Sequence, residues 1–434
     1  MKKAIIFFLC ALLSFGTVSC GNKKPALPEL GDGAKNVRIG GFIAPPPENY
    51  YGNNETYITE ERYREIKNVG FDFVVGHAET GLRNENVFAA LDCAKAAGVK
   101  YFVNADILSF YNATPERLRD AIGEVIAHEA CMGIFVNDEP SAKRFRALGA
   151  LQSRFEQVTD KIMHVNLLPY VEDANMLGVP TYGEYLDSYC ASVDNDFISM
   201  DIYPFYEKAE GERMRYSMSQ DWLKNLEMIQ TRASEHRLEH WQCVQGQKVF
   251  GHSKEPDYFD MRMQIYTSMA YGAEVFQYYC YFTPKESVLP CLIDKDGTQT
   301  SLYADAKKIN DEIHAFGKMF VHFASGWKGV LPVGACEDFD RLASPLKKTE
   351  RIESIQASEN ALIGVFEDED GRDAFLVTNY TVPGDRLNNE ITIKFNRTAE
   401  AVCYIGGVRS EKQLEKGELR LTLGPGEGVF VLPI

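Results

Sequence analysis

The 434-residue sequence lacks several motifs that would place it in common functional classes. Its ten cysteines include no Cys-x-x-Cys pair, and no histidine stands at ligand spacing from them, so a zinc site is not supported. No glycine-rich phosphate-binding turn follows any apolar run, which argues against a nucleotide-binding sheet. We therefore expect neither a metal nor a cofactor.

Positive charge is also scarce. The formal net charge is −16, and nowhere do more than two basic residues follow one another, as in Lys23-Lys24. This balance argues against nucleic acid and anionic membrane surfaces as partners. The length is sufficient for one large core and a second domain of roughly a hundred residues.

The amino terminus has the features of an export signal. Lys2 and Lys3 precede an apolar run at 4–13 that is too short to span a bilayer. The following Thr17-Val18-Ser19-Cys20 resembles a bacterial lipobox, which implies cleavage before Cys20 and lipidation of its sulfur. This resemblance predicts a signal peptide at 1–19, a tether at 20–36 and a lipid-anchored protein of the bacterial cell envelope, at the outer membrane or periplasmic face. An ordinary secretory signal peptide is the alternative.

Apolar runs alternate with helical patterns through most of the chain. The stretch at 131–140 is a short apolar run that ends in Asp138, Glu139 and Pro140, as a buried parallel strand does. Seven further strands are predicted at 37–44, 71–76, 100–105, 162–167, 197–202, 240–245 and 274–281. Helices are predicted at 59–68, 84–97, 114–126, 181–192, 219–236, 257–271 and 302–322. This alternation predicts an α/β fold, a closed (β/α)8 TIM barrel over 37–326, with a doubly wound open sheet as the rival.

From about residue 327 the pattern changes to short alternating segments separated by turn signals. Asp-Gly, Pro-Gly and Gly-Gly dipeptides connect them, as antiparallel hairpins require. We predict a small C-terminal antiparallel β-sandwich over 327–434, with strands at 361–366, 373–379, 390–395, 401–404, 419–423 and 428–432.

Polar side chains gather at the predicted strand ends. The carboxyl ends of the strands form one face of a (β/α)8 barrel, where such folds carry their active sites. Three carboxyl groups there, Asp138, Glu139 and Asp201, are the candidate catalytic residues, because hydrolysis of a glycosidic bond needs one acid and one carboxylate. The candidate substrate contacts are His77, Glu79, Asp106, Asn166, Tyr203, Trp241, Gln245 and Tyr279.

The segment Asn137-Asp138-Glu139-Pro140 resembles the Asn-Glu-Pro signature of clan A glycoside hydrolases, whose acid/base glutamate ends the fourth strand. Glu139 matches that glutamate, and Asp138 stands where the family has asparagine. The passage at 263–284 is also similar to barrel glycosidase-like lipoproteins of Bacteroides-type bacteria. The resemblance implies a glycosidase that acts on an oligo- or polysaccharide, with Glu139 as general acid.

One feature departs from the family. Clan A places a nucleophilic glutamate at the end of the seventh strand, where this chain has Gln245. Three interpretations stay open: an inverting enzyme with Glu139 as acid and Asp201 as base, substrate-assisted cleavage with Asp138 orienting an acetamido group, or a non-catalytic carbohydrate-binding protein. An interaction scaffold that binds no sugar is a further alternative.

Overall fold

The computed structural model describes residues 27–210, 213–219, 221–249 and 254–434. The predicted signal peptide, Cys20 and the first part of the tether lie outside the described residues. Within the described part of the chain, no helix combines the length and apolar character needed to cross a membrane.

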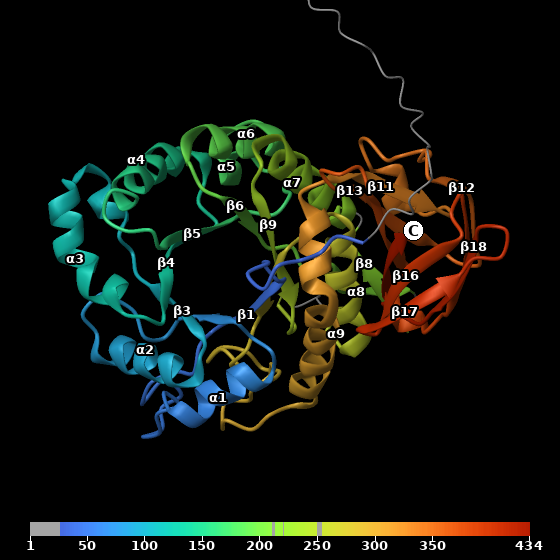
Figure 1. Cartoon of the computed structure of the whole chain (residues 1–434). Coiled ribbons are helices and arrows are strands. Elements are labelled where there is room, and N and C mark those ends of the chain that lie inside the picture. Colours follow the sequence, from blue (N-terminus) through green and yellow to red (C-terminus); the bar gives the residue numbers. More distant parts are fainter. Residues whose placement is uncertain (1–26, 211–212, 220, 250–253) are drawn as a thin grey trace, which may run out of the picture.

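Eight parallel strands close into a barrel in the order β1-β10-β9-β6-β5-β4-β3-β2 (Figure 1). This confirms the TIM barrel and excludes the open sheet, because β1 pairs with both β2 and β10. Each observed strand overlaps a predicted one. The barrel strands are β1 (Arg38–Phe42), β2 (Phe73–Val75), β3 (Lys100–Asn104), β4 (Cys131–Asp138), β5 (Ile162–Leu167), β6 (Phe197–Met200), β9 (Glu239–Gln245) and β10 (Val275–Tyr279).

Several barrel helices begin where the sequence supplies a capping side chain. The Thr114 hydroxyl accepts a hydrogen bond from the Arg117 N–H, and Pro115 is the first helical residue. Thr181 and Asp257 form reciprocal capping boxes with acidic residues three positions later. The main helices are α1 (Glu60–Asn68), α2 (Glu85–Ala97), α3 (Pro115–Ala127), α4 (Phe145–Phe155), α6 (Tyr182–Ser192), α7 (Trp222–His236), α8 (Tyr258–Ala270) and α9 (Ser301–Ala324), with short helices α5 (Ala174–Leu177) and α10 (Glu337–Asp340).

Aromatic rings fill the barrel interior. The rings of Phe197 and Trp241 stack with their centroids 4.0 Å apart, and Phe73 and Phe102 pack beside them. His164 lies above this layer, with its ring 5.0–5.6 Å from four aromatic rings. Inward side chains alternate along each strand, so this apolar layer is the floor beneath the polar residues at the strand ends.

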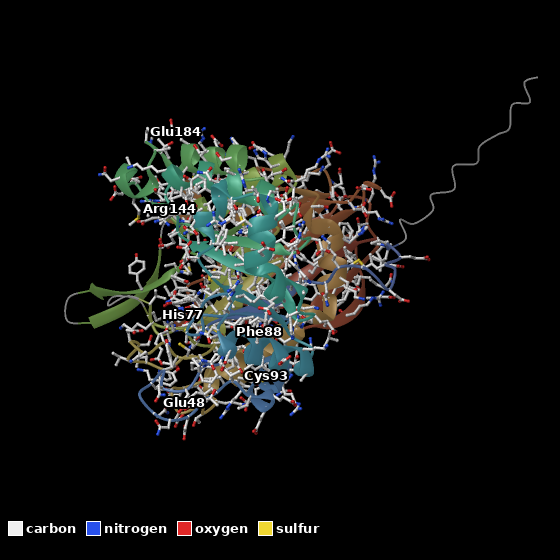
Figure 2. The ribbon with its side chains drawn as sticks, turned by 90° about the vertical axis from the view of Figure 1, so that its left-hand side faces the viewer. Glu48, His77, Phe88, Cys93, Arg144 and Glu184 are labelled. Atoms are coloured by element: carbon white, nitrogen blue, oxygen red, sulfur yellow. The ribbon has the colours of Figure 1, made fainter. Side chains whose placement is uncertain are left out.

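In the barrel part of the chain, helix α4, the short helix α5 and a hairpin were not predicted; in the C-terminal part the same holds for three strands, at 327–333, 352–357 and 408–413, and for the short helix at 337–340. The hairpin follows β6 and consists of β7 (Phe205–Glu210) and β8 (Arg213–Met218). Figure 2 shows it standing away from the body on the side of the molecule where His77 lies. The sequence signal for it is a pair of six-residue segments on either side of Gly211 and Glu212.

The C-terminal part contains the predicted antiparallel sheets. A six-stranded sheet, β11-β13-β14-β19-β16-β17, faces a three-stranded sheet, β12-β15-β18, and apolar side chains of both sheets share one core. The outer face of the larger sheet packs on α8 and α9, which separate it from the barrel in Figure 1. The strands are β11 (Trp327–Val333), β12 (Ile352–Ala357), β13 (Ala361–Glu367), β14 (Asp373–Asn379), β15 (Asn389–Phe395), β16 (Glu400–Ile405), β17 (Val408–Gln413), β18 (Glu418–Leu423) and β19 (Gly428–Pro433).

Because α8 and β13 are in close contact at Gly364, we expect one added methyl group there to destabilise the protein. A Cβ atom at Gly364 would overlap the backbone of Ala270, which cannot turn aside as a flexible side chain can. We expect Gly364→Ala to lower the free energy of unfolding by about 2 kcal/mol, as overpacking does. Gly123→Ala in α3 is the matched control, since its Cβ meets nothing within 4 Å and alanine favours the helix. Urea unfolding of both variants checks this, and an unchanged midpoint for Gly364→Ala would refute the tight contact.

Candidate active site

A cavity of about 150 Å³ opens at the carboxyl ends of the barrel strands. Three carboxylic residues line it: Asp138 at the end of β4, Glu139 directly after it, and Asp201 directly after β6. The remaining lining residues are Phe42, Phe135, His164, Asn166, Tyr203, Cys243, Val249, Gln277 and Tyr279. The structure therefore brings together all three predicted catalytic residues and three of the predicted substrate contacts.

One amide group connects two of the carboxyl groups. The strand register places Asp138 beside Asn166 and Asn166 beside Ser199, two residues before Asp201. The Asn166 Nδ2 atom donates to Asp201 Oδ1 at 2.7 Å and to Asp138 Oδ1 at 3.2 Å. The two carboxyl oxygens cannot lie farther apart than the sum of these distances. Asp138 and Asp201 are therefore close partners.

A chain of hydrogen bonds fixes the orientation of that amide. The Ser199 hydroxyl donates to Asn166 Oδ1 at 2.9 Å, which directs Nδ2 toward the carboxyl groups. Having given its only proton, Ser199 Oγ accepts from Gln277 Nε2 at 3.1 Å and faces His164 Nε2 at 3.2 Å. Desolvation lowers the pKa of His164 to about 3, so its ring is neutral at pH 7. Because Ser199 Oγ has no proton left to donate, His164 Nε2 carries the ring hydrogen and donates a hydrogen bond to Ser199 Oγ.

Burial sets the protonation state of Asp201. Desolvation is the largest cause, and together with the negative charges of Glu139 and Asp138 it raises the pKa of the Asp201 carboxyl to about 8. Hydrogen bonds from Asn166 and Tyr203 act in the opposite direction but are the smaller contributions. At pH 7 Asp201 therefore holds a proton and can act as an acid.

The other two carboxyl groups are more open to solvent. Desolvation raises the pKa of Asp138, while the hydrogen bond from Asn166 and the proximity of His77 lower it. For Glu139, desolvation and the charge of Asp138 both raise the pKa. Glu139 also has a φ of 45°, in the left-handed region that a side chain disfavours, and its N–H donates to the Asn166 carbonyl at 2.9 Å. Unusual backbone of this kind is concentrated at functional sites.

Aromatic rings form part of the cavity wall. Tyr279 lies between Tyr203 and Phe42, with ring centroids 5.6 Å and 6.0 Å away, and Phe42 packs edge-on against Phe135 at 5.3 Å. Such a wall offers apolar faces to the C–H groups of a sugar ring. His77 lies at the rim, exposed, with its ring 6.1 Å from that of Phe42; it is labelled in Figure 2.

The structure corrects the predicted position of Trp241. This residue lies near the amino-terminal end of β9. Its indole stacks in the barrel floor, and its Nε1 donates to Glu239 at 3.1 Å. Glu239 in turn pairs with Lys35 and Arg38 at that same end of the barrel. Trp241 is thus part of the aromatic floor and does not line the cavity.

Gln245 and Asp106, two further predicted substrate contacts, lie outside the cavity lining, and their side chains hydrogen-bond to the protein backbone. The Gln245 side chain is fully buried; its Oε1 accepts from the Phe205 N–H at 3.2 Å and its Nε2 donates to the Lys254 carbonyl at 3.0 Å. It joins the hairpin to the loop after β9. The Asp106 carboxylate accepts from the Leu108 N–H at 3.0 Å and begins a short 3-10 turn, η1 (Leu108–Asn112).

Glu79 was also predicted as a substrate contact, and the structure buries it completely. The Tyr101 hydroxyl donates to Glu79 Oε1, while Oε2 is buried without a hydrogen-bond partner. Desolvation raises the pKa of Glu79 to about 7. Glu79 follows β2 in the chain and is not among the residues that line the cavity.

Several residues of the site were not predicted from the sequence. His164, Gln277 and Cys243 line the cavity, and Ser199 contacts His164 and Gln277 beneath the carboxyl groups. A simple signal was available. Strand residues two positions apart face the same side, so His164, Ser199 and Gln277 share the face of Asn166, Asp201 and Tyr279. In the described chain, no group of three His, Cys, Asp or Glu residues is arranged to hold a metal ion.

Comparison with known proteins supports the fold. No protein-family model matches the chain, and no curated protein matches it. Among solved structures, a glycoside hydrolase family 5 protein from Bacteroides vulgatus matches over 92% of this chain and 89% of its own, with 10% identity and a TM-score of 0.53. A candidate α-galactosidase from Bacteroides fragilis matches over 92% and 79%, with 10% identity and a TM-score of 0.50. This chain therefore shares the architecture of barrel glycoside hydrolases.

Glu79→Gln should remove a pH-dependent loss of stability. The pKa of Glu79 is about 4.3 in an unfolded chain and about 7 in the folded protein. The folded state binds the proton more tightly, so stability is highest below the unfolded pKa and falls as the pH rises through the folded pKa. We expect the wild type to lose on the order of 2 kcal/mol relative to the variant between pH 4 and pH 8.

Urea unfolding of both proteins at the two pH values measures this difference. Glu124→Gln, at an exposed position of α3, is the matched control and should leave the pH dependence as in the wild type. Equal pH dependence in wild type and Glu79→Gln would show that Glu79 is not buried as an isolated carboxyl group.

Proposed function

We propose that this protein is a glycoside hydrolase that acts on an oligo- or polysaccharide. The observation that carries the proposal is the pair of carboxyl groups, Asp138 and Asp201, held on one amide at the mouth of the barrel. One of them keeps a proton at neutral pH and the other is more open to solvent, which provides the acid and the carboxylate that glycoside hydrolysis requires. The shared architecture of barrel glycosidases is consistent with this chemistry.

The short separation favours a double displacement. In inverting glycosidases the two catalytic carboxyl groups are at least ~6.5 Å apart. The Oδ1 atoms of Asp138 and Asp201 are closer than this, because the sum of their two distances to Asn166 Nδ2 is smaller. Asp138 then attacks the anomeric carbon while protonated Asp201 gives its proton to the leaving oxygen. Asp201, now a carboxylate, takes a proton from water, and that water releases the sugar from Asp138 with retained configuration.

Glu139 takes a different role in this scheme from the one the sequence implies. The Asn-Glu-Pro resemblance makes Glu139 the acid, and the inverting interpretation adds Asp201 as the base. A group with a pKa of about 8, however, is protonated at neutral pH and is a poor base there. Glu139 lines the cavity as a carboxylate whose charge helps to keep the proton on Asp201.

Two substitutions should separate the acid from the nucleophile. With a panel of 4-nitrophenyl glycosides, Asp138→Asn should abolish turnover whatever the leaving group, because no glycosyl–enzyme bond can form. Asp201→Asn should lower kcat/KM by about 10²–10⁴ for oligosaccharides, whose leaving group needs a proton, and by much less for nitrophenyl substrates. The wild-type rate on oligosaccharides should fall as the pH rises through about 8, because Asp201 loses its proton.

Asp106→Asn is the matched control, since Asp106 is exposed and lies outside the cavity lining. Glu139→Gln should leave turnover measurable and shift the alkaline limb of the pH profile downward, because it removes a charge that raises the Asp201 pKa. If Glu139→Gln instead shows the leaving-group dependence predicted for Asp201→Asn, Glu139 is the acid and the sequence-based assignment holds.

A non-catalytic carbohydrate-binding protein is the second candidate. Its support is the end of β9, where Gln245 stands in place of the family's nucleophile and is occupied in backbone hydrogen bonds. Glycan binding without turnover in the wild type would favour this candidate, and no binding to any sugar would favour an interaction scaffold.

We also propose that the protein is a lipoprotein of the bacterial cell envelope, anchored through Cys20. The support is the lipobox-like Thr17-Val18-Ser19-Cys20 behind a basic and apolar leader. Cys20→Ser should move the protein from the membrane fraction to the soluble fraction, because the acyl chains can no longer be attached. Fractionation followed by immunoblotting measures this, with Cys10→Ser as control, and membrane retention of Cys20→Ser would contradict the anchor.

A further inference from the structure

Two buried cysteines face each other beside the candidate active site. Cys280 directly follows Tyr279, the last residue of β10 and part of the cavity wall. Cys291 lies on the segment that returns across this strand end. Their Sγ atoms are 3.0 Å apart, and both side chains are fully buried.

Backbone hydrogen bonds hold the two segments together. The Ile293 N–H donates to the Tyr281 carbonyl at 2.9 Å, and the Thr283 N–H donates to the Ile293 carbonyl at 3.0 Å. The Thr283 hydroxyl also accepts from the Cys291 N–H at 2.9 Å. The proximity of the thiols is therefore a property of the paired backbones. A shift of about 1 Å would bring the sulfur atoms to the length of a disulfide bond.

The polar groups around the thiols suit both redox states. The Cys291 thiol contacts Gln247 Oε1 at 3.0 Å, and the Ser287 hydroxyl donates to the same oxygen at 3.0 Å. If the Cys291 S–H is lost, the buried Gln247 oxygen keeps the hydrogen bond from Ser287. The Gln247 oxygen therefore has a hydrogen-bond donor in both redox states, and neither state has the energetic cost of an unpaired buried acceptor.

We propose that Cys280 and Cys291 form a disulfide that fastens the rim segment 281–290 to the end of β10. The oxidant is a small-molecule disulfide or the disulfide of a thiol oxidoreductase. The two thiols give up two electrons and two protons, the Cys280–Cys291 bond forms, and the oxidant's disulfide is reduced to two thiols. Exchange needs opening of the rim segment, where Val288 is 95% exposed. The bond stabilises the wall that Tyr279 contributes to the cavity.

Peptide mapping tests the pairing directly. The full-length protein is equilibrated with glutathione disulfide or with a phosphine reductant, denatured in acid, alkylated and digested with trypsin. Cleavage after Lys285 places the two cysteines in separate peptides, residues 263–285 and 286–295, each with no other cysteine. In the oxidised sample we expect these peptides as one linked species, two hydrogen atoms lighter than their sum. The reductant should separate them and lower the Tm by roughly 5 °C.

Cys93→Ser on α2 is the matched control and should leave the linked species unchanged. Cys280→Ser and Cys291→Ser should each remove it and make the Tm insensitive to the reductant. The wild-type map decides the matter even if these variants fold poorly. Alkylation of both cysteines in the oxidised sample, or linkage of either one to a different cysteine, would overturn the proposal, and neither result depends on glycosidase activity.

Discussion

The candidate site depends on the hydrogen bonds from the Asn166 amide to Asp138 and Asp201. The amide can serve both carboxyl groups only because Ser199 occupies its oxygen. Ser199 itself accepts from Gln277 on β10, so groups from four barrel strands are needed to fix one side chain. The arrangement depends on strand order, because β10 and β6 lie on either side of β9 and β5 lies between β6 and β4.

The apolar floor explains why the site has its chemistry. Phe102, Phe135, Phe197 and Trp241 surround His164 and exclude water from beneath the polar layer. Desolvation then acts in opposite directions on the two kinds of group: it lowers the pKa of His164 and raises that of Asp201. Both groups become neutral at pH 7, one as a fixed hydrogen-bond donor and the other as an acid.

Three predicted substrate contacts, Trp241, Gln245 and Glu79, lie outside the cavity lining for one reason. They were placed at the cavity by their distance from a strand end, and each is held elsewhere by a partner distant in sequence or by the barrel core. The hairpin β7–β8 was missed because its segments are short, whereas helix α4 was missed although Phe145, Leu148, Leu151 and Phe155 stand at helical spacing. Position along a strand predicts which face a residue joins, but its depth depends on the register of the neighbouring strands.

The alternation of strands and helices, the change to short antiparallel strands near residue 327, and the carboxyl groups at the end of β4 were determined by the sequence itself, because periodicity, capping residues and turn residues act locally. Only the tertiary structure decided which carboxyl groups are partners. Asp138 and Asp201 are far apart in the chain, and the register of β4, β5 and β6 places Asn166 between them. The tertiary structure also decided that Asp201 keeps a proton at pH 7, because the desolvation that raises its pKa depends on neighbours that no local pattern reveals.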